Sequence, residues 1–70
     1  MTKNTKQVLQ DVRALYAQWF KEDPGQIVHV TFDSDMNYVI HHENKRTIKI
    51  SRKTIDDSNH IEIKRALRNF

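Results

Sequence analysis

The chain contains no cysteine, one glycine and one proline among its 70 residues. Without cysteine, neither a disulfide framework nor thiolate chemistry can hold the fold together or drive catalysis. The single glycine leaves no glycine-rich phosphate loop, so no nucleotide cofactor is expected. No apolar run approaches the ~20 residues that span a bilayer, and the first residues form no signal-peptide core. These absences predict a cytoplasmic protein that needs no cofactor and makes no membrane contact.

Charged residues make up 30% of the chain and hydrophobic residues 37%. This balance is typical of a folded domain rather than of a disordered or low-complexity chain. Residues 1–70 are long enough for a single domain, which buries roughly 60% of the surface that its unfolded form exposes. We therefore expect one small core without a deep substrate cleft inside it.

The positive charge is concentrated in the second part of the chain. Residues 1–44 hold four Lys or Arg and six Asp or Glu, a net charge of −2, whereas residues 45–70 hold eight against three, a net charge of +5. Such asymmetry favours a polyanionic partner, a nucleic acid or a nucleoprotein complex, although a charged surface that serves only solubility is the alternative. The candidate binding residues are Lys45, Arg46, Lys49, Arg52, Lys53, Lys64, Arg65 and Arg68.

A helix is predicted near the start of the chain, because its apolar residues recur at i, i+3, i+4 and i+7. These residues are Val8, Leu9, Val12, Leu15, Tyr16, Trp19 and Phe20. Thr2 or Thr5 is the expected N-cap, and Asp23-Pro24-Gly25 is expected to follow the end of the helix. The aromatic residues in this series could stack on bases, but their helical spacing favours core packing.

Three β-strands are predicted over residues 27–32, 36–42 and 46–51, where apolar and polar residues alternate. The turns between them fit a three-stranded antiparallel meander. The inward residues expected from this alternation are Val28, Val30, Phe32, Met36, Tyr38, Ile40, His42, Ile48 and Ile50. The other face of the sheet is expected to carry Ile27, His29, Thr31, Val39 and His41.

A second helix of about three turns is predicted to begin after Asp56-Asp57-Ser58 and to run to the end of the chain. Its apolar face would hold Ile63, Ala66, Leu67 and Phe70. The predicted fold class is therefore α+β, in the order α-β-β-β-α, with a three-stranded antiparallel sheet and two helices packed on one face.

This order resembles the double-stranded-RNA-binding-domain fold and the HicA-type mRNA interferases built on it. Tyr38–His42 lies where the second strand of that family would be, and Thr47–Ile50 followed by a basic stretch resembles the remainder. The position of the family's catalytic histidine falls near Asn37, with no glycine before it. The resemblance implies an endoribonuclease toxin. By size and composition, the chain also looks like small phage-encoded inhibitors of the anti-CRISPR type.

Four histidines invite a metal or acid–base interpretation. His41 and His42 are adjacent in a predicted strand and therefore point to opposite faces, whereas His29 on the neighbouring strand is placed to approach His41. No metal-ligand spacing is present, so no metal is expected. The candidate general base is His41 or His42 with Lys49 as anion stabiliser, and the alternative is that the histidines are structural.

The acidic segment Asp33-Ser34-Asp35 has two interpretations. Paired carboxylates suit a divalent cation, and a solvated hairpin turn explains the same composition without one.

The favoured function is that of a non-enzymatic small binding protein. It would dock on a nucleic acid or nucleoprotein complex through the basic surface of its C-terminal half, in the setting of a phage or mobile-element inhibitor of host defence. A HicA-like endoribonuclease toxin is one alternative. A protein–protein interaction module or homodimer, paired through an exposed strand edge or sheet face, is the other.

Overall fold

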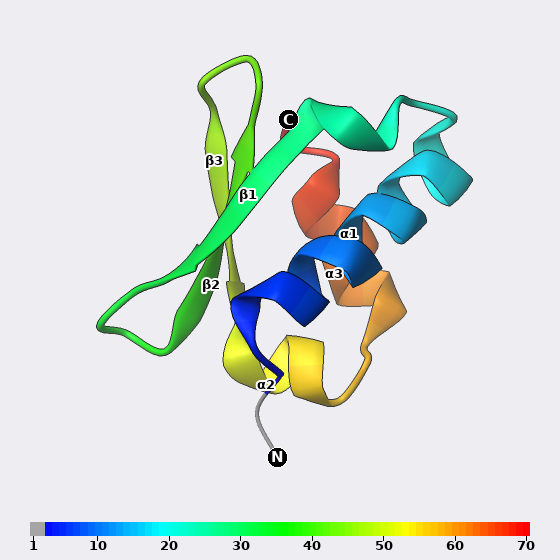
Figure 1. Cartoon of the computed structure of the whole chain (residues 1–70). Helices are drawn as coiled ribbons and strands as arrows, with labels where there is room; N and C mark the ends of the chain where they lie inside the picture. Colours follow the sequence, from blue (N-terminus) through cyan, green and yellow to red (C-terminus); the bar gives the residue numbers. More distant parts are fainter. Residues whose placement is uncertain (1–2) are drawn as a thin grey trace.

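The computed structural model describes residues 3–70 and shows one antiparallel sheet with helices on one of its faces (Figure 1). The predicted α+β fold is confirmed. Its elements are α1 (Thr5–Phe20), the 3-10 turn η1 (Pro24–Gln26), β1 (Ile27–Phe32), β2 (Asn37–His42), β3 (Thr47–Ser51), α2 (Arg52–Asp56) and α3 (His60–Leu67). The strands are ordered β1-β2-β3, so β2 is central and both of its neighbours are edge strands. No helix within residues 3–70 has the length and apolar character that crossing a membrane requires.

Helix α1 begins and ends close to the predicted residues, but its cap is a different side chain. The Asn4 side-chain oxygen accepts a hydrogen bond from the Gln7 N–H at 2.8 Å, so Asn4 rather than Thr5 is the N-cap. The other predicted cap, Thr2, lies outside the described residues. At the C-terminal end, Lys21 adopts a left-handed conformation and donates its backbone N–H to the Ala17 carbonyl. This cap turns the chain towards η1 and β1.

Strand β1 departs from the predicted alternation because it contains a β-bulge. Its register shifts between Ile27, which pairs with His42, and His29, which pairs with His41. One extra residue reverses the side-chain parity, so Ile27 is fully buried and Val28 is exposed. The predictions for these two residues were wrong, as was the inward placement of Phe32, which is 43% exposed.

Strands β2 and β3 follow the predicted pattern. Tyr38, Ile40 and His42 are buried on β2, and Ile48 and Ile50 are buried on β3. Met36 is the exception. It lies in the β1–β2 turn with φ 66° and is 49% exposed, because the strand begins one residue later than predicted.

The segment after β3 forms two short helices instead of a link and one longer helix. The Ser51 hydroxyl accepts from the Thr54 N–H at 3.1 Å and starts α2 directly after the strand. Helix α2 buries Ile55, and Ser58 with φ 53° then breaks the helical path. Asn59 caps α3, which starts at His60 as predicted. Ser51 is thus both the last residue of β3 and the N-cap of α2, and Ile55 of α2 packs in the core.

Candidate nucleic-acid interface

The fold distributes the eight candidate cations over separate parts of the molecule. Lys45 and Arg46 lie in the β2–β3 turn, and Arg52 and Lys53 lie in α2, at the opposite end of β3. The five residues of β3 separate these two pairs by about 17 Å. Lys49 projects from the middle of β3, and the remaining three, Lys64, Arg65 and Arg68, lie on or directly after α3 in the helical layer (Figure 1).

Carboxylates neutralise three of these cations. Lys49 Nζ lies 3.5 Å from Asp33 Oδ2, Arg52 Nε lies 3.6 Å from Asp56 Oδ2, and Arg65 Nη1 lies 3.2 Å from Glu62 Oε1. Lys64 Nζ lies 5.9 Å from the centroid of the Trp19 ring, a cation–π distance. Within residues 3–70, Lys45, Arg46, Lys53 and Arg68 have no carboxylate partner. These are the cations that remain available to an external anion.

The β2–β3 turn holds its two cations on an ordered backbone. The Asn44 side-chain oxygen accepts from the Arg46 N–H at 2.9 Å, and His42 Nδ1 accepts from the Asn44 N–H at 3.0 Å. Lys45 occupies a left-handed conformation with φ 74°, and its N–H donates to the His42 carbonyl. These bonds order the backbone from which the two exposed cationic side chains extend.

The sheet face opposite the helices carries a pair of histidines beside this turn. The rings of His29 and His41 stack at a centroid distance of 4.1 Å with an interplanar angle of 18°. His41 Nε2 lies 3.0 Å from Thr31 Oγ1, which orients the central ring. Burial, and to a lesser extent the neighbouring His29, lowers the pKa of His41. The His41 ring is therefore mainly uncharged at neutral pH.

A hollow of about 330 Å³ joins the histidine pair to the cationic turn. Its lining consists of Val28, His29, His41, His42, Glu43, Lys45 and Arg46. Val28 reaches this hollow only because of the β1 bulge, so the alternation in the sequence could not have assigned it there. The proximity of His29 to His41, in contrast, was predicted and is confirmed.

His42 belongs to the core and not to this exposed pair. It is 8% exposed, and Nε2 lies 3.3 Å from the Tyr16 hydroxyl, which donates to Gln26 Oε1. Nδ1 accepts the Asn44 N–H. Since both ring nitrogens are occupied inside the fold, the structural interpretation fits His42 and the general-base interpretation does not.

The Asp33 carboxylate of the acidic segment hydrogen-bonds to the backbone of its own turn. Asp33 Oδ1 accepts from the Asp35 and Asn37 N–H groups at 2.9 and 3.0 Å, an Asx-type turn. The pKa of Asp33 is lowered, mainly because its carboxylate accepts the Asn37 N–H bond. Burial opposes this effect, and the Asp35 N–H and Lys49 lower the pKa further. Within residues 3–70, no three His, Cys, Asp or Glu side chains gather around a common metal position.

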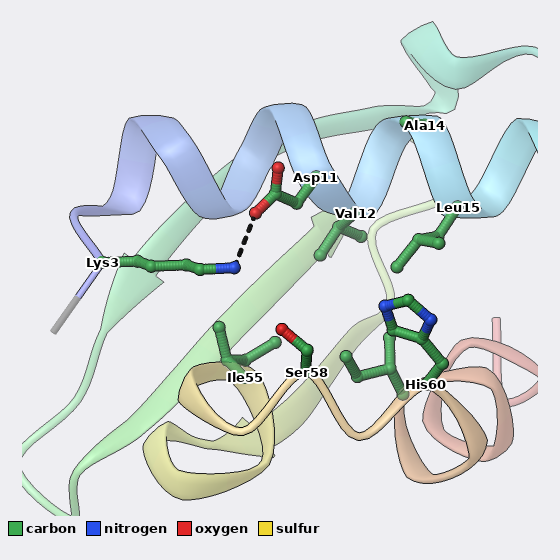
Figure 2. Close-up of a pocket in the computed structure, with 9 residues that line it drawn as sticks. Lys3, Asp11, Val12, Ala14, Leu15, Ile55, Ser58 and His60 are labelled. Atoms are coloured by element: carbon green, nitrogen blue, oxygen red, sulfur yellow. Dashed lines mark hydrogen bonds and ion pairs between the residues drawn. The ribbon is translucent and has the colours of Figure 1, made fainter. Parts of the chain in front are cut away.

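A second hollow, of about 320 Å³, lies between α1 and the α2–α3 connection (Figure 2). Val12, Leu15 and Ile55 form part of its apolar wall, and His60 lies at one end. Lys3 also lines this hollow, and its Nζ lies 3.0 Å from Asp11 Oδ2 in an ion pair. This hollow is therefore less suited to an anion than the hollow beside the β2–β3 turn.

The aromatic residues of α1 pack into the core, as their spacing favours. Tyr16 is buried, and Trp19 and Phe20 are partly buried against the same cluster. Trp19 meets His60 edge-on at 5.7 Å, and Tyr16 lies 5.5 Å from Phe20. They form no free stacking platform.

No protein-family model, no curated protein and no solved structure matches the chain.

Proposed function

We propose that this protein is a non-catalytic nucleic-acid-binding module that docks through the β2–β3 turn and the adjoining open face of the sheet. One observation carries the proposal: Lys45 and Arg46, without carboxylate partners in the described chain, border a hollow that also exposes two stacked imidazole rings. Phosphate oxygens are bound by such cations, and aromatic rings offer a surface to bases.

Only the end of the molecule that carries the β2–β3 turn belongs to the proposed binding surface. The α2 pair lies at the far end of β3, and Arg52 there is already paired with Asp56. Arg68 follows α3, whose C-terminal end lies towards the same end as the β2–β3 turn (Figure 1).

The test is fluorescence anisotropy with labelled RNA and DNA strands at several salt concentrations. The variant Lys45→Gln/Arg46→Gln removes both turn charges and is expected to weaken binding about tenfold at low salt. It should also reduce the slope of log K against log salt by about 1.4 for a single strand, because two phosphate contacts are lost.

The matched control is Lys6→Gln/Lys53→Gln, which removes two exposed cations where α1 begins beside α2 (Figure 1). The net charge of the two variants is identical, so only the position of the charges differs. Equal weakening by both variants would contradict docking at the turn. Circular dichroism of each variant verifies that the fold persists.

The same titration, read on a denaturing gel, separates the two alternative functions. Shortened RNA would support a HicA-like endoribonuclease, in which case His41→Ala should restore intact RNA. If the protein neither binds nor cleaves the nucleic acids, its partner is expected to be another protein or a second copy of this chain. In a phage-encoded inhibitor of the anti-CRISPR type, the small basic module would dock on the nucleic acid of a nucleoprotein complex through the same turn.

A further inference from the structure

We infer that the hollow beside the β2–β3 turn takes one unpaired base of a single-stranded nucleic acid, stacked against the His29–His41 pair. This inference rests on the proposed function and adds the form of nucleic acid and the group that is recognised. The volume of the hollow, about 330 Å³, lies at the lower end of the roughly 300–1,000 Å³ range of small-molecule sites.

The bulge and the strand register build the aromatic wall of this hollow. His29 and His41 are Cα partners across β1 and β2, so both side chains emerge on the face that the helices leave open. Their rings lie nearly parallel, as in a base stack, and Thr31 Oγ1 holds the orientation of the His41 ring. A base adds to such a stack through its flat face, whatever its sequence.

The charged side chains at the rim of the hollow determine how the nucleic-acid strand would be oriented there. Lys45 and Arg46 lie on the turn side of the hollow, where the phosphates that flank the base would be bound. The Glu43 carboxylate on the same rim repels a further phosphate and can accept a hydrogen bond from a base amino group. Phosphate on the cations and base in the hollow is therefore the arrangement with complementary charge.

A base-paired duplex does not fit this arrangement. Inside a duplex both faces of each base are covered by their neighbours, so the histidine rings could reach a base only after it had been extruded. The other end of β1 is also unfavourable for a second backbone contact, because the β1–β2 turn carries Asp33 and Asp35. The open face therefore selects for unpaired nucleotides.

The experiment compares three probes of equal length, about ten nucleotides, in the anisotropy assay. The probes are a mixed-sequence single strand, its duplex, and an abasic strand with the same phosphates. The intact single strand is expected to bind about tenfold more tightly than the abasic strand. His29→Ala should remove this difference, and His29→Phe should retain it because the stacking surface remains.

His60→Ala is the matched control, since His60 is exposed but lies on α3 against Trp19. It should leave all three affinities unchanged. A direct readout is the upfield shift of the His29 and His41 ring protons on addition of the intact strand, because a stacked base shields them.

The outcomes separate the inference from the proposed function. If Lys45→Gln/Arg46→Gln weakens binding but duplex, abasic and intact strands bind equally, base stacking is wrong and docking at the turn stands. If His29→Ala has no effect on the intact strand, the inference is likewise overturned. If the unmodified protein binds none of the probes, both proposals fail.

Discussion

Individual residues of one chemical type have different roles here, because their surroundings differ. Strand alternation separates His41 on the open face from His42 in the core, where Tyr16 and the Asn44 N–H occupy the His42 ring nitrogens. His41 instead stacks on His29 and lies 3.0 Å from the Thr31 hydroxyl. Of these two adjacent histidines, His41 therefore presents its ring on the open face, whereas His42 lines the same hollow but is only 8% exposed.

At this scale we predict that His29→Ala raises the pKa of His41. The substitution exposes the His41 ring and removes a neighbouring positive charge, which are the two causes that lower its pKa below 6.5. NMR titration of the ring protons from about pH 5 to pH 8 measures the change. An unchanged or lower midpoint for His41 would contradict the stacked geometry.

The β1–β2 turn shows how one element depends on a single side chain. Asp33 holds two backbone N–H groups of the turn and reaches Lys49 on β3, so it links all three strands. Its pKa is lowered in the folded protein from the ordinary 3.8. The stability that this carboxylate contributes is therefore present above that value and is lost as pH falls through the folded-state pKa.

We predict that Asp33→Asn lowers stability at neutral pH and flattens the acid side of the pH–stability profile. Asparagine retains an oxygen for the turn but loses the charge that favours the Asn37 N–H bond and the Lys49 pair. Urea unfolding at a series of pH values measures both effects. Asp57→Asn on the α2–α3 connection is the control, and an equal response from the two variants would show that Asp33 has no special role.

On the scale of the whole molecule, all elements share a single core. The molecule measures 29 × 22 × 19 Å, and its buried cluster combines apolar residues of α1, the sheet, α2 and α3. Ile40 on the central strand is fully buried in this cluster. A chain of 70 residues has a free energy of unfolding of only about 4–10 kcal/mol, so one large cavity removes much of it.

Ile40→Ala is accordingly predicted to lower the free energy of unfolding by about 2–5 kcal/mol, and Ile40→Val by about 1 kcal/mol. Ile61→Ala provides the comparison at the surface, because Ile61 is 70% exposed, and should change the free energy by less than about 0.5 kcal/mol. Urea denaturation of the three variants measures these differences. Similar losses at positions 40 and 61 would be incompatible with a core centred on β2.

Local sequence patterns were sufficient for the long helix and for the two later strands. The apolar period of residues 8–20 predicts α1, and the alternation over residues 38–50 predicts β2 and β3 with the correct inward residues. The opposite orientations of His41 and His42 follow from the same strand geometry. Ion pairs at i,i+3 and i,i+4, such as Arg52–Asp56, are also of this local kind.

Tertiary structure decided the features that depend on distant partners. The bulge that buries Ile27 and exposes Val28 arises in the pairing of β1 with β2, and no local signal marks it. The Lys49–Asp33 pair joins β3 to the β1–β2 turn, and the turn and α2 cations separate because β3 is extended. The sequence by itself determined α1, the three strands and the basic half of the chain, whereas α2 was not predicted. Strand register and packing decided which cations of this half lie beside the histidine pair, because these residues become neighbours only after folding.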